Sequence, residues 1–371
     1  MLAVLRHVET ILTARQGCDS WNLHLDKLCF DNTAEGKTDA LRRVADSWRS
    51  KSSSHLKDAC ERKLLWLDRL RVQNGDRFRR VSLVNESRLL LHLSRANVLE
   101  NVGLYADRTT GLPLIPGTAL KGVLSTWASW EANLNDDTGF NELASFLSQR
   151  SQFKSPDASR VFGDDSKKGS NHSGDIIFVG GFPAEPQKLP RLEADIVTPH
   201  PDDGRGRILP NVFLACAPDA VWHFVFLARP GADATRLLEQ TVNWLIEALP
   251  NTGIGAKTAA GYGRFRTLND EEQRRIQQQD DARLDALRQH QADQEAKAQR
   301  DKLPPEERAF VEYVANQKDW VAAAREVATR PEQERQKILR YFRSERGQAL
   351  LKTWTNDKGR KRIEALKAAG L

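Results

Sequence analysis

The sequence predicts an α+β protein with a ferredoxin-like core, a helical lead-in before it and an all-helical extension after it. Up to about residue 78 the apolar residues recur every three or four positions, as they do on helices. From residue 79, short apolar strands and amphipathic helices follow in the order strand, helix, strand, strand, helix, strand. This order is the split β-α-β arrangement, which many RNA-recognition domains share.

The chain divides into four predicted segments. Residues 1–78 form a helical segment packed on the core, and residues 79–268 form the ferredoxin-like domain. Residues 269–302 are nearly all charged residues, Gln and Ala. They predict a charged helical linker that is either a lone solvated helix or disordered. Two prolines then interrupt the pattern, and residues 303–371 resume it as a small helical module.

Each core element has its own signal. Three apolar runs predict strands: SRLLLHLS (87–94), GDIIFVGGF (174–182) and VWHFVFLAR (221–229). The stretches PGTALKGVLSTWASWEA, from Pro116, and DATRLLEQTVNWLIEAL, from Asp233, place apolar residues on one face of a helix. GRFRTL (263–268) is the last predicted strand.

Composition indicates a soluble chain that meets a polyanion. No apolar run approaches the roughly 20 residues of a membrane helix, and the N-terminus lacks a signal-peptide cleavage site. The net charge of +6 and the pI near 9.1 favour an acidic partner. The four cysteines lack metal-ligand spacing, which predicts free thiols in a reducing cytoplasm and neither metal nor other cofactor. They are Cys18, Cys29, Cys60 and Cys216.

The stretch GIGAKTAAGYGRF (253–265) holds four glycines, a lysine and a threonine. It is not a nucleotide P-loop, because Ala256 stands where that motif requires glycine and because a helix precedes the loop and a strand follows it. Two interpretations stay open. The glycines relieve crowding in a tight connection, or they let a nucleic-acid backbone approach main-chain amides, with basic and aromatic side chains between them.

Two motifs resemble the RAMP superfamily, the RNA-binding proteins of CRISPR effector complexes. They are this glycine-rich loop and GLPLIPGTALKGVL (111–124), in the family's order. Four further segments support the resemblance: VLENVG (98–103), VFGDD (161–165), LEADIVTPH (192–200) and NLHLDK (22–27). The last two resemble the RAMP subunit that caps the 5′-tag-distal end of the backbone in type III-B (Cmr) complexes.

The resemblance spans about residues 20–268 and has departures. GGFPA replaces the usual acidic residue after a strand, PDDGRGR stands where an aromatic residue is expected, and the tail from residue 269 lies outside it. It implies a non-catalytic crRNA-binding backbone subunit, which contacts crRNA and target RNA, a neighbouring RAMP subunit and the small helical subunit. The residues expected to contact RNA are Gly117, Thr118, Lys121, Arg108, Arg205, Arg207, Gly253, Gly255, Lys257, Thr258, Gly261, Tyr262, Gly263 and Arg264.

Two alternatives stay open. Metal-independent crRNA-processing endoribonucleases share this fold, but His24, His55 and His92 are isolated in the sequence and Asp107 is a single acid near a glycine-containing loop. We therefore expect no catalytic residue. The other alternative is a protein–protein scaffold dominated by the helical tail.

Overall fold

The computed structural model describes residues 34–50, 54–91, 104–134, 156–164, 172–197, 211–231, 233–316 and 319–371. Two compact units make up the chain, and the division falls between Leu284 and Asp285. That point lies inside the long helix α9 (Asp270–Asp301), so α9 belongs to both units.

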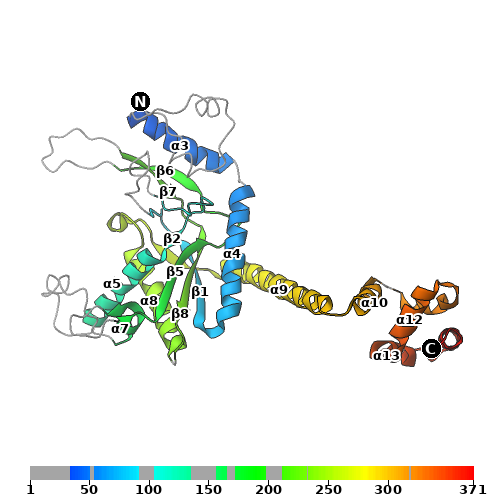
Figure 1. The fold of residues 1–371 in the computed structure, drawn as a ribbon. Coiled ribbons are helices and arrows are strands. Elements are labelled where there is room, and N and C mark those ends of the chain that lie inside the picture. Colours follow the sequence, from blue (N-terminus) through cyan, green and yellow to red (C-terminus); the bar gives the residue numbers. More distant parts are fainter. Residues whose placement is uncertain are drawn as a thin grey trace, which may run out of the picture. The chain divides into compact units, whose positions relative to one another are not determined.

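A five-stranded sheet forms the centre of the first unit (Figure 1). Its order is β2-β5-β8-β1-β9, and every neighbouring pair is antiparallel. Helix α5 (Gly117–Leu134) lies between β1 and β5 in sequence, and α8 (Ala234–Thr252) lies between β8 and β9. Strand order and connections are those of a ferredoxin-like domain, so the predicted fold class is confirmed. The strands are β1 (Phe78–Asn85), β2 (Ile115–Pro116), β5 (Ile176–Pro183), β8 (Val221–Ala228) and β9 (Phe265–Thr267).

The prediction for the first core strand is wrong. That strand is β1, and the predicted run 87–94 contributes only an isolated bridge between Leu89 and Cys216, while its residues 92–94 lie outside the described residues. Strand β1 places two polar residues, Arg80 and Ser82, on the face that α4 and α9 cover, so the buried face of this strand shows no apolar pattern. Residues Leu89, Leu90 and Leu91 are buried without forming a named strand, so this apolar run reflects burial and not a core strand.

Helices cover both faces of the sheet (Figure 1). On one face, α5 and α8 bury the main hydrophobic core, which includes Leu124 and Leu245. On the other face, α4 (Ser54–Asn74) packs Leu64 and Leu67 against strand residues, and α9 inserts Ile276. Many RNA-recognition domains stack bases on an open sheet face. Here the described helices occupy that face, so the sheet offers no such platform.

Polar contacts fix the first part of α9 to the sheet. Asn269 and Glu272 form a reciprocal capping box at 2.9 Å in each direction, and Arg275 donates to the buried Glu185 at 2.7 Å. Further along, Arg80 of β1 pairs with Asp68 of α4 at 2.8 Å and with Asp280 of α9. The expectation of a lone or disordered segment is therefore wrong for this part of the helix.

Beside the sheet, the first unit holds a two-stranded ribbon of β6 (Leu192–Val197) and β7 (Asn211–Cys216). Helix α3 (Ala34–Ser50) packs on this ribbon, and its Leu41 and Val44 join the main core. The smaller elements are the 3-10 turns η1 (Gly75–Arg77) and η3 (Thr258–Ala260), helix α7 (Pro156–Phe162), β3 (Gly163–Asp164) and β4 (His172–Ser173).

The second unit is all-helical and has its own core. The ring of Trp320 stacks on Tyr341 at 3.6 Å, and Phe342 is fully buried beside them. This confirms the predicted C-terminal helical extension. Its helices are the second part of α9, α10 (Pro305–Asn316), α11 (Trp320–Arg325), the 3-10 turn η4 (Val327–Thr329), α12 (Glu332–Arg343), α13 (Glu345–Thr353) and α14 (Asp357–Ala368).

Candidate nucleic-acid interface

The two glycine-containing motifs meet at one cavity of about 500 Å³ in the first unit. One wall is a face of α5, and the other is the end of α8 with the loop that follows it. The lining residues are Leu91, Ala119, Gly122, Val123, Thr126, Trp130, Thr252, Gly253, Gly255, Ala256 and Thr258. Three predicted site residues, Gly253, Gly255 and Thr258, are therefore in the wall.

At three of the four loop glycines, the protein's own backbone lies too close to leave room for a Cβ atom. A Cβ on Gly255 would lie 2.1 Å from the carbonyl oxygen of Leu90, and a Cβ on Gly263 would lie 2.0 Å from that of Ile254. A Cβ on Gly253 would lie 2.7 Å from the carbonyl oxygen of Tyr262. Gly261 differs: its φ is +88°, but nothing lies within 4 Å of an added Cβ. Crowding and left-handed backbone together explain the glycine pattern.

Internal hydrogen bonds occupy several amides of the loop. The amide of Ala256 donates to Leu90 and that of Gly263 to Arg88, both at 2.8 Å, so the loop lies along residues 88–90. The amide of Ile254 donates across the loop to Gly263 at 2.9 Å. Four other amides make no hydrogen bond to a described residue: Gly255, Lys257, Thr258 and Ala259. Lys257 has a left-handed φ of +56°, a geometry found where successive amides form anion-binding concavities.

The loop's large side chains mostly contact the protein. Tyr262 donates its hydroxyl to Asp195 of β6 at 2.5 Å, and Arg264 donates to the carbonyl of Asn251, in the last turn of α8, at 2.7 Å. Burial and the bond to Asp195 raise the pKa of Tyr262 to about 12. The ammonium of Lys257 lies 5.8 Å from the ring centroid of Phe213 in β7. Tyr262, Arg264 and Asp195 thus order the loop.

The first turn of α5 holds the other predicted cluster. Gly117 begins the helix, and a Cβ there would lie 1.9 Å from the carbonyl oxygen of Phe178, so this glycine lets α5 approach β5. Thr118 and Lys121 are exposed and make no hydrogen bond or ion pair to a described residue. Ala119 follows Thr118 and Gly122 follows Lys121, and both of these following residues line the cavity. The partial positive charge of a helix N-terminus favours an anion at this turn.

Arg108 lies elsewhere, in a turn next to α4. His55 of α4 hydrogen-bonds the carbonyl of Thr110 at 3.0 Å, and Asp107 accepts from the amide and hydroxyl of Thr109 at 2.9 and 2.6 Å. Arg108 is exposed and is not among the residues of the cavity wall. His55 and Asp107 both have structural partners in this turn.

Several predicted residues and motifs lie outside the described residues. They are Arg205, Arg207, His24, His92, the segments 22–27 and 98–103, and the end of 192–200.

The sequence interpretation missed the part of the cavity wall that α5 provides beyond its first turn. Ala119, Val123, Thr126 and Trp130 lie three, four or seven residues apart, so they share one helix face. That spacing is visible in the sequence and could have identified them. Trp130 is 38% exposed, and its ring centroid lies 6.4 Å from that of Trp127. An exposed tryptophan beside free amides combines a stacking surface with phosphate donors.

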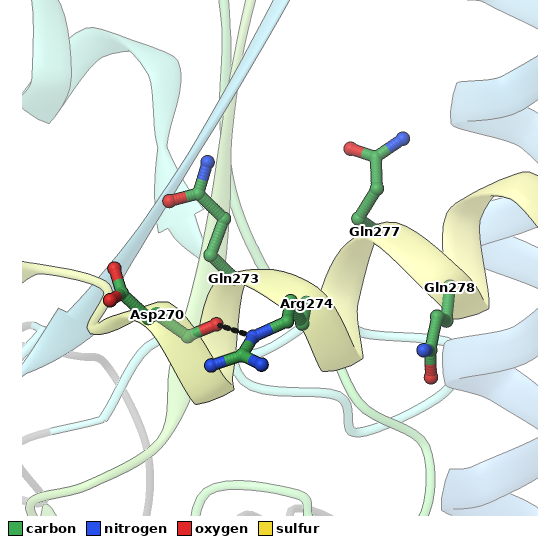
Figure 2. Close-up of a pocket in the computed structure, with 5 residues that line it drawn as sticks. All are labelled: Asp270, Gln273, Arg274, Gln277 and Gln278. Atoms are coloured by element: carbon green, nitrogen blue, oxygen red, sulfur yellow. Dashed lines mark hydrogen bonds between the residues drawn. The ribbon is translucent and has the colours of Figure 1, made fainter.

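A second hollow, of about 430 Å³, lies along α9. Its lining residues, Asp270, Gln273, Arg274, Gln277 and Gln278, all come from that one helix (Figure 2). The guanidinium of Arg274 donates to the carbonyl of Asp270 at 3.1 Å. None of the predicted site residues is in this wall.

Two searches of the described residues found nothing. No group of three or more His, Cys, Asp or Glu side chains is placed to hold a metal ion. No helix in that part of the chain combines the length and apolarity needed to cross a bilayer.

Comparisons with known proteins agree with the motifs. A family model of the RAMP superfamily matches residues 67–266. The chain is 27% identical over 232 residues to the CRISPR system Cmr subunit Cmr6 of Pyrococcus furiosus, covering 48% of this chain and 65% of that protein. Less than two thirds of that relative's length is therefore matched.

Two solved structures are similar to this chain. One is a cryo-EM structure of the type III-B Cmr-beta bound to cognate target RNA, at 18% identity and a TM-score of 0.40, covering 57% of this chain and 66% of that one. The other is the crystal structure of Cmr6 from Pyrococcus furiosus, at 22% identity and a TM-score of 0.36, covering 52% and 98%. The family model covers more than half of the chain, so this protein belongs to the RAMP superfamily.

Proposed function

We propose that this chain is a non-catalytic, crRNA-binding backbone subunit of a type III-B CRISPR effector complex. Within that complex it caps the end of the backbone distal to the crRNA 5′ tag. It contacts guide and target RNA, a neighbouring RAMP subunit and the small helical subunit. The similarity to Cmr6 supports the choice of complex, and membership of the RAMP superfamily supports RNA as the ligand.

The observation that carries the proposal is the meeting of the two motifs at one cavity. The exposed first turn of α5, with Thr118 and Lys121, brings a helix N-terminus and a cation to one side. The loop brings Lys257 and the unpaired amides beside it to the other. Backbone amides, helix N-termini and lysines are the usual donors to phosphate oxygens, and such contacts do not depend on base sequence.

The internal hydrogen bonds narrow the proposed binding segment. Residues 253–256 and 261–264 are held against the protein. Residues 257–260 form the turn between them, in which Lys257 and Thr258 are half-buried and Ala259 and Ala260 are exposed. We assign the phosphate contacts to this turn and to the first turn of α5. Gly253, Gly255, Gly263, Tyr262 and Arg264 then support the loop, and Gly261 permits its left-handed return.

A charge-neutralising double variant tests this assignment. Lys121→Gln with Lys257→Gln removes two cations that are sequence neighbours of wall residues, Gly122 for the first and Ala256 and Thr258 for the second. The control, Lys57→Gln with Lys188→Gln, removes two lysines that have no wall residue beside them in the sequence and form no ion pair with a described residue. Binding of the full chain to a labelled single-stranded RNA is measured by fluorescence anisotropy over a salt series.

Each lost phosphate contact lowers the salt slope by about 0.7, so the site variant should lose about 1.4 and bind about 25-fold more weakly at 0.1 M salt. The control should match the native chain. Equal behaviour of the two variants would overturn the assignment.

The proposal that the chain is not a nuclease has a separate test. Two histidines of the described region have other partners: His55 contacts Thr110, and the buried His223 hydrogen-bonds Ser82 at 2.9 Å. Incubating the purified chain with CRISPR repeat RNA in EDTA should leave the RNA intact. Specific cleavage would favour the alternative of a metal-independent endoribonuclease.

A further inference from the structure

The chain's whole net positive charge resides in its last three helices. Residues 332–371, which contain α12, α13 and α14, have eleven Lys and Arg and five Asp and Glu. The preceding 331 residues have 45 of each, while the whole chain carries +6. Such segregation creates a strong local potential on a protein whose remaining surface is close to neutral.

Six of these cations are exposed and make no ion pair or hydrogen bond to a described residue: Arg346, Lys352, Lys358, Arg360, Lys361 and Lys367. Other cations of the unit do have partners. Arg330 pairs with Glu326 at 3.2 Å and with Glu334 at 3.3 Å, and Arg340 pairs with Glu307 at 3.6 Å. The unpaired cations therefore concentrate on α13 and α14.

Helix α14 presents its cations along one outer side. Gly359 and Leu366 are buried, and a Cβ on Gly359 would lie 2.7 Å from the Cβ of Trp354. At 100° per residue these positions define the inner face. Lys361 then lies nearly opposite that face, with the other exposed cations of α14 on either side of it.

The surface lacks the features of a protein interface. Large hydrophobic side chains that are exposed occur in the described region only before residue 247, and none belongs to the second unit. Protein interfaces have an apolar, aromatic centre, whereas nucleic-acid interfaces are polar and strongly positive. Cations free of acidic partners remain available for phosphate.

We propose that α13 and α14 form a second RNA-binding surface, which contacts the phosphate backbone without reading base sequence. The choice of RNA over another polyanion rests on the proposed function of the first unit. The chain then has two RNA-binding surfaces, one in each unit: the cavity between α5 and the glycine-rich loop, and the cations of α13 and α14.

A neutralising triple variant of the full chain tests the proposal: Arg360→Gln, Lys361→Gln and Lys367→Gln. The matched control is Arg288→Gln, Lys297→Gln and Lys302→Gln. It removes the same charge from two exposed residues of α9 and from Lys302, just after its end, in a segment (285–302) that has four cations and four anions. Binding to a labelled 40-nucleotide RNA is measured over a salt series, and circular dichroism checks that the helices persist.

The tail variant should lose about 2 from the salt slope and bind RNA about 100-fold more weakly at 0.1 M salt. The charge-preserving variant Arg360→Lys, Lys361→Arg and Lys367→Arg should bind as the native chain does. A loss of RNA affinity no larger than that of the control variant overturns the proposal. Unchanged RNA binding together with lost assembly into the complex also overturns it, because the surface would then dock a protein. If the tail variant lost RNA affinity and the Lys121 and Lys257 variant did not, the function proposed for the first unit would be wrong, whereas RNA binding by the tail would be supported.

Discussion

Replacing Gly255 and Gly261 separately with alanine distinguishes what the loop glycines do. Gly255 has a φ of +98°, and its added Cβ would lie 2.1 Å from the carbonyl oxygen of Leu90. The backbone must move, and the hydrogen bond from Ala256 to that oxygen is lost. Left-handed strain of about 1–2 kcal/mol and a lost buried hydrogen bond of about 1–3 kcal/mol together give roughly 3 kcal/mol of destabilisation.

Gly261→Ala is the matched control. Its φ of +88° imposes similar strain, but an added Cβ meets nothing within 4 Å. We expect about 1–2 kcal/mol of destabilisation from this change. Urea unfolding followed by circular dichroism gives both free energies, and amide exchange of Ala256, whose N–H donates to Leu90, reports whether the contact is lost.

The two alanine variants should differ by about 1–2 kcal/mol, and only Gly255→Ala should raise amide exchange at Ala256. Equal destabilisation would refute the reasoning that contact with the protein's own backbone selects glycine at this position. If Gly255→Ala left stability unchanged and abolished RNA binding, the glycine would serve the ligand directly.

Three further predictions follow. Trp130→Ala should weaken RNA binding about 5- to 150-fold, because base stacking is lost. The control Trp66→Ala changes a similarly exposed tryptophan of α4 outside the cavity and should leave RNA binding unchanged. Equal losses of affinity would contradict the stacking role. Tyr262→Phe should lower the free energy of unfolding by about 1 kcal/mol by removing the hydroxyl bond and leave RNA affinity unchanged, so a large affinity loss would assign the hydroxyl to RNA. Burial and the nearby arginines hold the pKa of His223 well below 6.5, so its contribution to stability is complete above pH 6.5 and falls by up to about 1.4 kcal/mol per pH unit below it. For His223→Gln, the free energy of unfolding in urea should therefore depend less on pH between pH 5 and 8 than it does for the native chain. An unchanged slope would contradict the prediction.

The order of core elements could be predicted because most of them carry local signals. Helices α5 and α8 show apolar periodicity, and β5 and β8 are apolar runs. Strand β1 could not be recognised, because Arg80 is buried in an ion-pair network whose partners, Asp68 and Asp280, lie 12 and 200 residues away in sequence. A buried arginine with remote partners resembles a surface arginine when read locally.

The glycine-rich loop shows the same limit at the site. Sequence reasoning identified Gly253–Arg264 as special but left open whether a ligand or the protein requires the glycines. The deciding atoms, such as the carbonyl oxygens of Leu90 and Ile254, come from segments whose approach no local pattern reveals. The contribution of Trp130 was, by contrast, readable from its spacing along α5.

The central claim is that RNA lies between the first turns of α5 and the turn of the glycine-rich loop. Photocrosslinking of 4-thiouridine-labelled RNA to the full chain, mapped by mass spectrometry, tests it most directly. Crosslinks should concentrate in residues 117–130 and 252–262, with a separate group in α13–α14. Crosslinks confined to α4, α9 or the β6–β7 ribbon would contradict the claim.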